Sequence, residues 1–248
     1  MFKVRATLVA FLGDEEKYPC HMQHQIGDQI VFDGERYTGR LCPDVWPLLT
    51  TKVSALHQAG PRYVEPHYYY PFWYAPPSLR DPAKKKFDGL GFRNVLATYD
   101  EPQHHMATIA PPNAFKWPPH PERTVAREIT ITCPDLRTAA VFALEAFDLS
   151  DRGFAVPFFR RQMMMLARAL KYPGIDEARV LELFTQEERE EIYPPLTPEL
   201  LVPLTEELEL MGYITRSDRK ICVTDSGERK LKAFADSLTS EERLSLQL

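Results

Sequence analysis

Three cysteines and one histidine have the residue types and the spacing of metal ligands. Cys20 and His24 are four residues apart, so one helical turn or one tight loop brings both side chains to the same side. Cys42 and Cys133 each begin a Cys-Pro-Asp tripeptide, in which the proline fixes φ and turns the backbone away after the sulfur. Zinc takes thiolate and imidazole ligands in a tetrahedron. The four residues therefore predict a closed Cys3His site for zinc, with iron or an iron–sulfur cluster as the alternative.

A second interpretation of the cysteines needs no metal. Free cysteine is among the most buried residue types, and the chain has no paired Cys-x-x-Cys spacing. Three buried thiols in a hydrophobic core would give the same pattern. The fourth cysteine, Cys222, alternates with Val223 in a predicted strand, and we expect it to be buried in a core.

The bulk composition predicts a cytoplasmic protein of two domains. The chain has 248 residues, of which 44% are hydrophobic and 26% are charged, and these fractions are ordinary for globular proteins. Its net charge of −5 provides no positive field that would attract nucleic acid or an anionic membrane. The sequence has no recognisable secretory signal and no apolar run of membrane-spanning length. Four cysteines in that context favour the reducing cytosol, without a disulfide framework.

Hydrophobic periodicity predicts that residues 1–147 form a small α+β domain. Residues 2–12 alternate as a half-buried strand does, and residues 45–56 repeat apolar side chains at helical spacing. Gly60 and Pro61 end that helix, and Pro43 is expected at its first position. Further strands are predicted at residues 28–32, 125–132 and 139–144. We expect a small antiparallel sheet with one helix, with the cysteines in its loops.

A long insert at residues 61–124 interrupts this domain. It holds 12 of the 22 prolines and 12 of the 28 aromatic residues, most densely at residues 63–74. Such a composition predicts an ordered loop, which forms either the wall of a small-molecule site, a surface for a protein partner, or a second small core that covers the sheet. The insert also carries acid–base candidates for catalysis, namely Glu65, His67, His104 and His105.

Residues 148–248 predict a second, mainly helical domain. Helices are expected at residues 158–170, 177–184, 185–192 and 197–211, with Pro203 kinking or splitting the last of these. Strands at residues 213–215 and 221–224 then form a hairpin, and a final helix follows from residue 225. The outer face of the 197–211 helix is expected to carry four acidic residues and no basic one: Glu199, Glu206, Glu207 and Glu209. Residues 151–248 hold 14 basic and 18 acidic residues, so this domain favours contact with protein over DNA.

Several motifs in order resemble a short, uncharacterised bacterial domain family. They are Lys3-Val4-Arg5-Ala6-Thr7, then Cys20-x3-His24-x2-Gly27-Asp28, then Leu41-Cys42-Pro43 and finally Cys133-Pro134-Asp135 ahead of Val141-Phe142. The resemblance covers about residues 1–60 and 124–147 and implies the fold and the cysteine cluster, but no function. The helix, hairpin and helix of residues 178–237 resemble the winged-helix domains of bacterial regulators.

Three functions remain open from the sequence. The first is a metal-binding accessory or subunit protein with a structural Cys3His site, which uses the insert and the winged helix as interaction surfaces for a protein partner or a second copy. The second is a metalloenzyme acting on a small molecule bound by the insert, with aromatic compounds as one candidate class. The third is a metal- or redox-responsive winged-helix transcription regulator. The complete ligand set counts against the second, since catalytic zinc keeps an open position. The acidic helix counts against the third.

Overall fold

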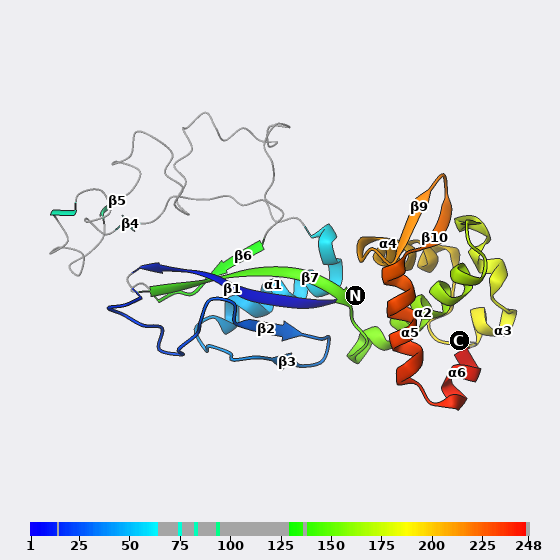
Figure 1. Cartoon of the computed structure of the whole chain (residues 1–248), viewed down its shortest axis with the longest axis horizontal. Helices are drawn as coiled ribbons and strands as arrows, with labels where there is room; N and C mark the ends of the chain where they lie inside the picture. The colour runs from blue at the N-terminus through cyan, green and yellow to red at the C-terminus, as the bar shows by residue number, and fades with distance from the viewer. Residues whose placement is uncertain are drawn as a thin grey trace. The chain divides into compact units, whose positions relative to one another are not determined.

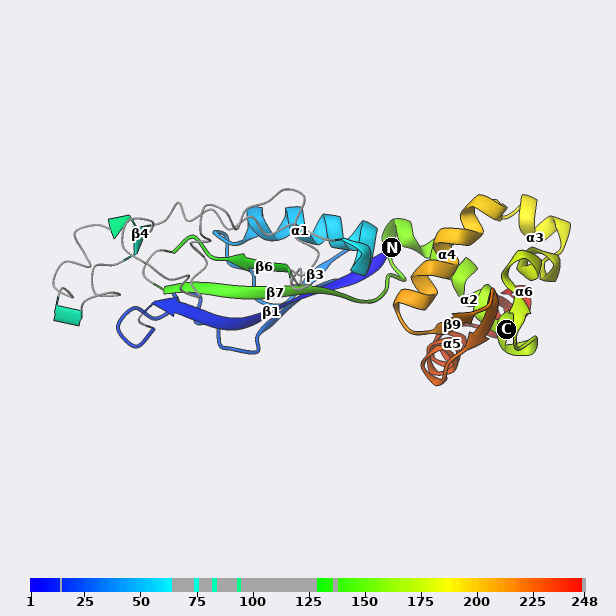
Figure 2. The same cartoon turned by 90° about the horizontal axis from the view of Figure 1, so that it is seen from above.

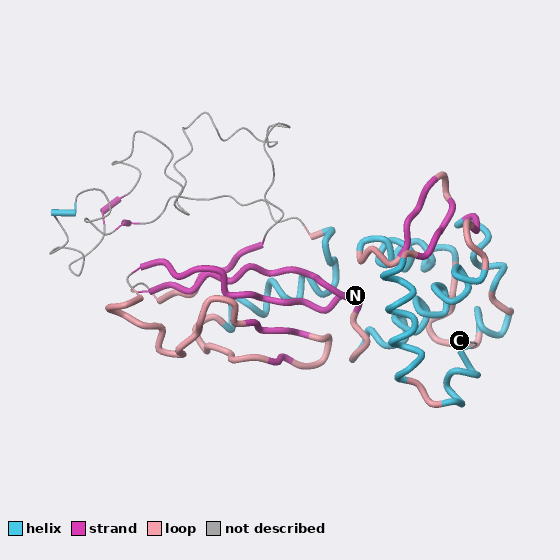
Figure 3. The backbone as a smooth tube through the Cα atoms, in the orientation of Figure 1, coloured by secondary structure: helices cyan, strands magenta, loops and turns pink. Residues whose placement is uncertain are grey.

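The computed structural model describes residues 1–13, 15–63, 74–75, 82–83, 93–94, 129–135 and 138–246. It has helices and antiparallel sheets, so the protein is of the α+β class. One compact unit comprises Met1–Val64 and Glu128–Leu248, and Glu65–Arg127 is a separate unit. In the separate unit, β4 (Tyr74–Ala75) pairs antiparallel with β5 (Arg93–Asn94). Figure 3 shows that strands dominate the first part of the larger unit and helices the rest.

A five-stranded antiparallel sheet has the strand order β3-β2-β1-β7-β6 (Figure 1). Its strands are β1 (Phe2–Gly13), β2 (Gln29–Phe32), β3 (Tyr37–Thr38), β6 (Ile129–Thr132) and β7 (Thr138–Leu149). The two central strands pair from Phe2↔Leu149 to Gly13↔Thr138, with register shifts at Lys3/Val4 and Leu8/Ala10. The alternation predicted for residues 2–12 is therefore confirmed. β7 is longer than predicted and extends past the proposed boundary at residue 147.

One helix covers one face of this sheet. α1 (Trp46–Ala59) lies along one face of the sheet, above the strands in the view of Figure 2. Its residues Leu49, Val53 and Leu56 are buried in the core on that face. The helix ends at Gly60, whose φ of 60° is accessible to glycine at low cost. A Cβ at Gly60 would lie 2.3 Å from the ring of Phe2, so this close approach also requires glycine. The short 3-10 helix η1 (Gly60–Arg62) follows.

The helical part begins after β7. It comprises η5 (Gly153–Ala155), α2 (Val156–Lys171), β8 (Ile175–Asp176), η6 (Glu177–Leu183), α3 (Gln186–Glu190), α4 (Pro198–Leu210), β9 (Ile214–Ser217), β10 (Lys220–Val223), α5 (Asp225–Ser237) and α6 (Ser240–Leu246). The three short strands form a sheet in the order β8-β10-β9. α4 continues through Pro203 as one helix, capped by the side chain of Thr197. The winged-helix assignment of this order stays a prediction.

Two hydrophobic cores form within the larger unit. One lies between α1 and the sheet and contains Cys42 and Cys133. The other surrounds α2 and also contains Phe2 and Leu149, the paired ends of β1 and β7. The two central strands therefore contribute to both cores.

Three expectations on single residues were wrong. Cys222 is exposed, because Ile221 takes the inward position in β10 and its neighbour points away. Glu207 is buried rather than on the outer face of α4, because Gln162 and Arg62 both donate hydrogen bonds to its carboxylate. Pro43 is not at the first helical position, because a turn precedes the helix, which begins at Trp46.

Candidate metal centre

The loop between β1 and β2 holds the first two predicted ligands. Its ends are fixed to Leu8, whose N–H donates to the carbonyl of Asp28 at 2.9 Å and whose carbonyl accepts from Gly27 at 2.8 Å. Within the loop, the N–H of Gln23 donates to the carbonyl of Cys20 at 2.7 Å and closes a turn. The loop from Cys20 to Asp28 is therefore anchored to the central strand of the sheet.

Arg40 joins this loop to the segment that leads into α1. Its Nη1 donates to the carbonyls of Met22 at 2.7 Å and Gln23 at 3.1 Å. Because Arg40 is only two residues before Cys42, these bonds hold the loop beside the second cysteine.

Cys42 lies in the turn ahead of α1. Its carbonyl accepts hydrogen bonds from Val45 at 3.2 Å and from Trp46 at 3.1 Å, which fixes the backbone that carries the thiol. The side chain is buried in the core between the helix and the sheet. The turn thus directs a sulfur atom inward while the adjacent Asp44 stays exposed.

His21, Cys42 and Asp44 form a compact group of ligand atoms. The Nε2 atom of His21 lies 4.0 Å from the Sγ atom of Cys42. One ligand atom from each of the three residues lies within 4.8 Å of the other two. Within the described ranges, this group and not the predicted set of four meets that distance. The two sets have Cys42 in common, and His21 and Asp44 are exposed while the thiol is buried.

His24 has the environment of an oriented ligand. Its side chain is 2% exposed, and its Nδ1 atom lies 3.2 Å from the Oδ2 atom of Asp28. The backbone N–H of Gln25 donates to the same oxygen, and this bond, followed by the one to His24, lowers the pKa of Asp28. An ionised Asp28 favours the tautomer with the proton on Nδ1 and leaves a lone pair on Nε2.

The Nε2 atom of His24 is buried and has no hydrogen-bond partner among the residues that the structure describes. The ring packs edge-to-face on Phe142, with centroids 5.7 Å apart. Phe142 lies in β7 in the same core as Cys42 and Cys133. A buried acceptor left unpaired costs free energy, which a metal ion at this nitrogen would recover.

Cys133 enters the same core from the end of β6. Its N–H donates to the carbonyl of Ala140, and the N–H of Asp135 donates to its sulfur at 3.4 Å. Burial raises the pKa of Cys133, the Asp135 bond opposes this shift, and the charge of Cys42 adds to it. The two thiols of the Cys-Pro-Asp tripeptides therefore belong to one core.

The structure places two of the predicted ligands in one core and the other two in the loop between β1 and β2. Cys42 and Cys133 share one core, and His24 lies at its edge against Phe142. Cys20 is half-buried at the start of the loop, outside the close group. The predicted ligand set missed His21, although its position beside Cys20 and three residues before His24 was a visible signal.

The catalytic candidates of the insert, Glu65, His67, His104 and His105, lie outside the described residues. His57, elsewhere in the chain, is a structural residue. Its Nδ1–H donates to the carbonyl of Phe2 at 2.6 Å, and burial lowers its pKa.

The hairpin of β9 and β10 offers little free positive charge. Arg216 pairs with Glu209 at 2.5 Å and with Glu177 at 3.2 Å. Its charge is therefore already balanced within the chain, which leaves Arg219 and Lys220 as the exposed basic residues of the hairpin.

In comparisons with known proteins, no family model, no curated protein and no solved structure matches this chain. The resemblances described from the sequence therefore stay predictions. No helix in the described part of the chain is both long enough and apolar enough to cross a membrane.

Proposed function

We propose that this protein is a metal-binding accessory or subunit protein. In this proposal a zinc ion lies between Cys42, Cys133 and His24, with Cys20 or His21 as the fourth ligand. Of these residues Cys42 and His21 belong to the close group of ligand atoms, so the other side chains would move toward the ion when it binds. Both candidates for the fourth position are in the loop that Arg40 fixes beside Cys42. Two thiolates with one or two imidazoles match the ligand preference of zinc.

The observation that carries this proposal is the environment of His24. A ligating histidine usually donates its other ring N–H to a carboxylate, which fixes both the tautomer and the orientation of the ring. The Asp28 carboxylate is in position to accept a hydrogen bond from the Nδ1–H of His24. The Nε2 atom on the other side of the ring is buried without a partner in the described residues. A histidine that only packed in the core would gain the bond to Asp28 but would still leave its Nε2 atom without a partner.

A structural role for the ion follows from the surroundings of the ligands. Cys42 and Cys133 lie in the main core of the sheet, 3% and 8% exposed, where substrate has little access. The proposed ligands come from three separate segments of the chain, namely the loop between β1 and β2, the turn ahead of α1 and the end of β6. An ion that joins these segments contributes to folding directly, as structural zinc does in small domains.

The test is metal binding by variants of single cysteines. We expect purified protein to take up one equivalent of zinc and, with cobalt in its place, to show the absorption of tetrahedral thiolate ligation. Cys42→Ser and Cys133→Ser should each lose most of the affinity. Cys222→Ser is the matched control, because this thiol is exposed and belongs to the hairpin of β9 and β10. Equal loss in the control, or no uptake by the wild-type protein, would contradict the proposal.

The helical part is proposed to contact protein rather than DNA. α4 presents Glu199 and Glu206 without a basic residue of its own, and the charge of Arg216 is balanced by two glutamates. Phosphate contacts and base reading both need donors, which α4 lacks and which the hairpin supplies only through Arg219 and Lys220. Fluorescence anisotropy with random and genomic duplexes at low salt is expected to show no sequence-dependent binding. Tight, sequence-dependent binding would favour the transcription regulator instead.

A further inference from the structure

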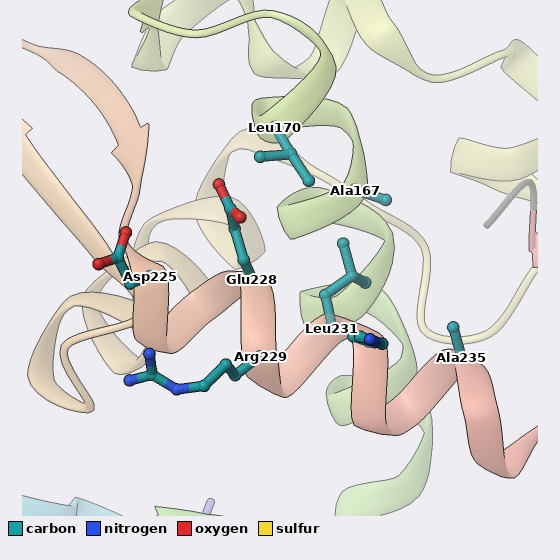
Figure 4. Close-up of a pocket in the computed structure, with 8 residues that line it drawn as sticks. Ala167, Leu170, Asp225, Glu228, Arg229, Leu231 and Ala235 are labelled. Atoms are coloured by element: carbon teal, nitrogen blue, oxygen red, sulfur yellow. The ribbon is translucent and has the colours of Figure 1, made fainter.

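A groove runs between α2 and α5 on the surface of the helical part (Figure 4). Its volume is about 620 Å³. Ala167 and Leu170 line it from α2, and Leu231 and Ala235 line it from α5. Leu170 is 39% exposed, and the two alanines leave room for the backbone of another helix to approach. The floor of the groove is therefore apolar and open to a partner.

A stripe along α5 combines this apolar floor with opposite charges. Glu228, Leu231, Lys232 and Ala235 recur at intervals of three and four residues, so they lie on one face of the helix. Figure 4 shows Glu228 projecting from α5 toward the turn of α2 that carries Leu170. The stripe thus has an acidic residue on one side of Leu231 and a basic residue on the other.

Four charged residues line this groove, namely Asp225, Glu228, Arg229 and Lys232. None of them has an ion-pair partner among the residues that the structure describes. Glu228 precedes Lys232 by four residues, the spacing and order that favour a pair along one helix, yet the two do not form one here. The neighbouring Lys230 does pair, with Asp148 at 2.6 Å. The groove therefore offers charges of both signs beside its apolar floor, which a partner of matching charge pattern can pair.

We propose that this groove binds a second copy of the same chain, with the two α5 helices antiparallel across a twofold axis that passes midway between Glu228 and Lys232 on the groove face. In that arrangement Glu228 of one copy faces Lys232 of the other, and the same pair forms again by symmetry. Leu170 and Leu231 pack at the centre, between the two pairs. The two halves of a twofold interface must be self-complementary, and this stripe satisfies the requirement because its charges are placed symmetrically about its middle.

The charge pattern of the stripe favours a second copy over a different protein. A helix of another protein would match this pattern only if it carried a basic and an acidic residue at the same spacing. A second copy, related by a twofold axis, always does. Antiparallel helices also place the positive end of one helix dipole near the negative end of the other. The observations therefore favour a homodimer over an unrelated partner.

The experiment is sedimentation equilibrium of the full chain together with charge-exchange variants. We expect wild-type protein to dimerise from a monomer of 28.6 kDa, with a dissociation constant that rises with salt. Glu228→Lys turns both pairs repulsive and is expected to weaken the dimer about tenfold or more. The double variant Glu228→Lys/Lys232→Glu reverses the pair and is expected to restore the dimer.

Glu187→Lys is the matched control, because Glu187 is exposed on α3 and the substitution changes the net charge equally. It is expected to dimerise as the wild type does. Three results would overturn the proposal: a monomer at every soluble concentration, a dimer unaffected by Glu228→Lys, or a double variant as weak as the single one. Far-UV circular dichroism establishes that each variant is folded, which is expected because the three substituted residues are exposed.

Discussion

Replacement of His24 by leucine should have opposite consequences in the presence and absence of zinc. In the metal-free protein the buried Nε2 atom has no partner in the described residues, and such an orphan costs about 1–3 kcal/mol. Leucine removes that cost and fills a similar volume against Phe142. It also removes the bond to Asp28, but the carboxylate side chain there is 40% exposed and is therefore screened by solvent. We expect the free energy of unfolding in a chelator to stay within about 1 kcal/mol of wild type, or to rise.

With zinc present, the expected result reverses. At a free zinc concentration of about 100 times the dissociation constant, binding adds about 2.7 kcal/mol to the stability of the wild-type protein. The variant lacks one ligand and should gain almost none of this. Urea unfolding followed by circular dichroism measures the free energy of unfolding of the wild type and the variant, once in chelator and once in buffered zinc.

The matched control is His57→Leu, which removes a buried histidine away from the metal loop. It loses the bond to the carbonyl of Phe2 and should be destabilised equally in both conditions. The reasoning is refuted if His24→Leu gains as much from zinc as the wild type. It is also refuted if the variant is severely destabilised in chelator, because His24 would then be a packing residue.

Three further predictions concern other positions. Asp28→Asn removes the carboxylate that orients the candidate ligand histidine, and isothermal titration should show zinc affinity about 10–100-fold lower. Burial lowers the pKa of His57, so the unfolded chain binds a proton there more readily. The stability that this residue contributes is therefore complete above its ordinary pKa of 6.5 and is lost as pH falls through the lowered value. His57→Gln keeps a donor for the Phe2 carbonyl and should flatten this part of the pH dependence of the unfolding free energy, measured by urea unfolding. Arg168→Met leaves the buried carboxylate of Glu188 without its partner and should cost about 3–5 kcal/mol in urea unfolding, partly recovered by Arg168→Met/Glu188→Leu.

Local periodicity predicted most of the described elements. The alternation of residues 2–12 required a strand because one face is buried, and the apolar spacing of residues 45–56 required a helix against that face. The ends of elements were less predictable. Pro43 had the right chemistry for a helix start, but the helix begins at Trp46, after a turn that the Cys42 carbonyl organises.

The candidate site was predictable in its residue types but not in its geometry. Cys42 and Cys133 lie in the same core because β6 pairs with β7 beside the strand under α1, and no local pattern encodes that arrangement. The choice between Cys20 and His21 depends on the positive φ of Gln23 and on the bonds from Arg40, which set the course of the loop. Spacing along the sequence does not contain that information.

The paired ends of β1 and β7 lead to an expectation about how the molecule opens. Phe2 and Leu149 belong to the core around α2, while Val4 and Leu144 of the same strands belong to the core under α1. Amide hydrogen exchange should therefore find one cooperative opening that exposes both cores together, rather than two independent ones. A protein divided at residue 147 would leave Phe2 without its packing partners, so neither half should show the exchange protection that it has in the intact chain.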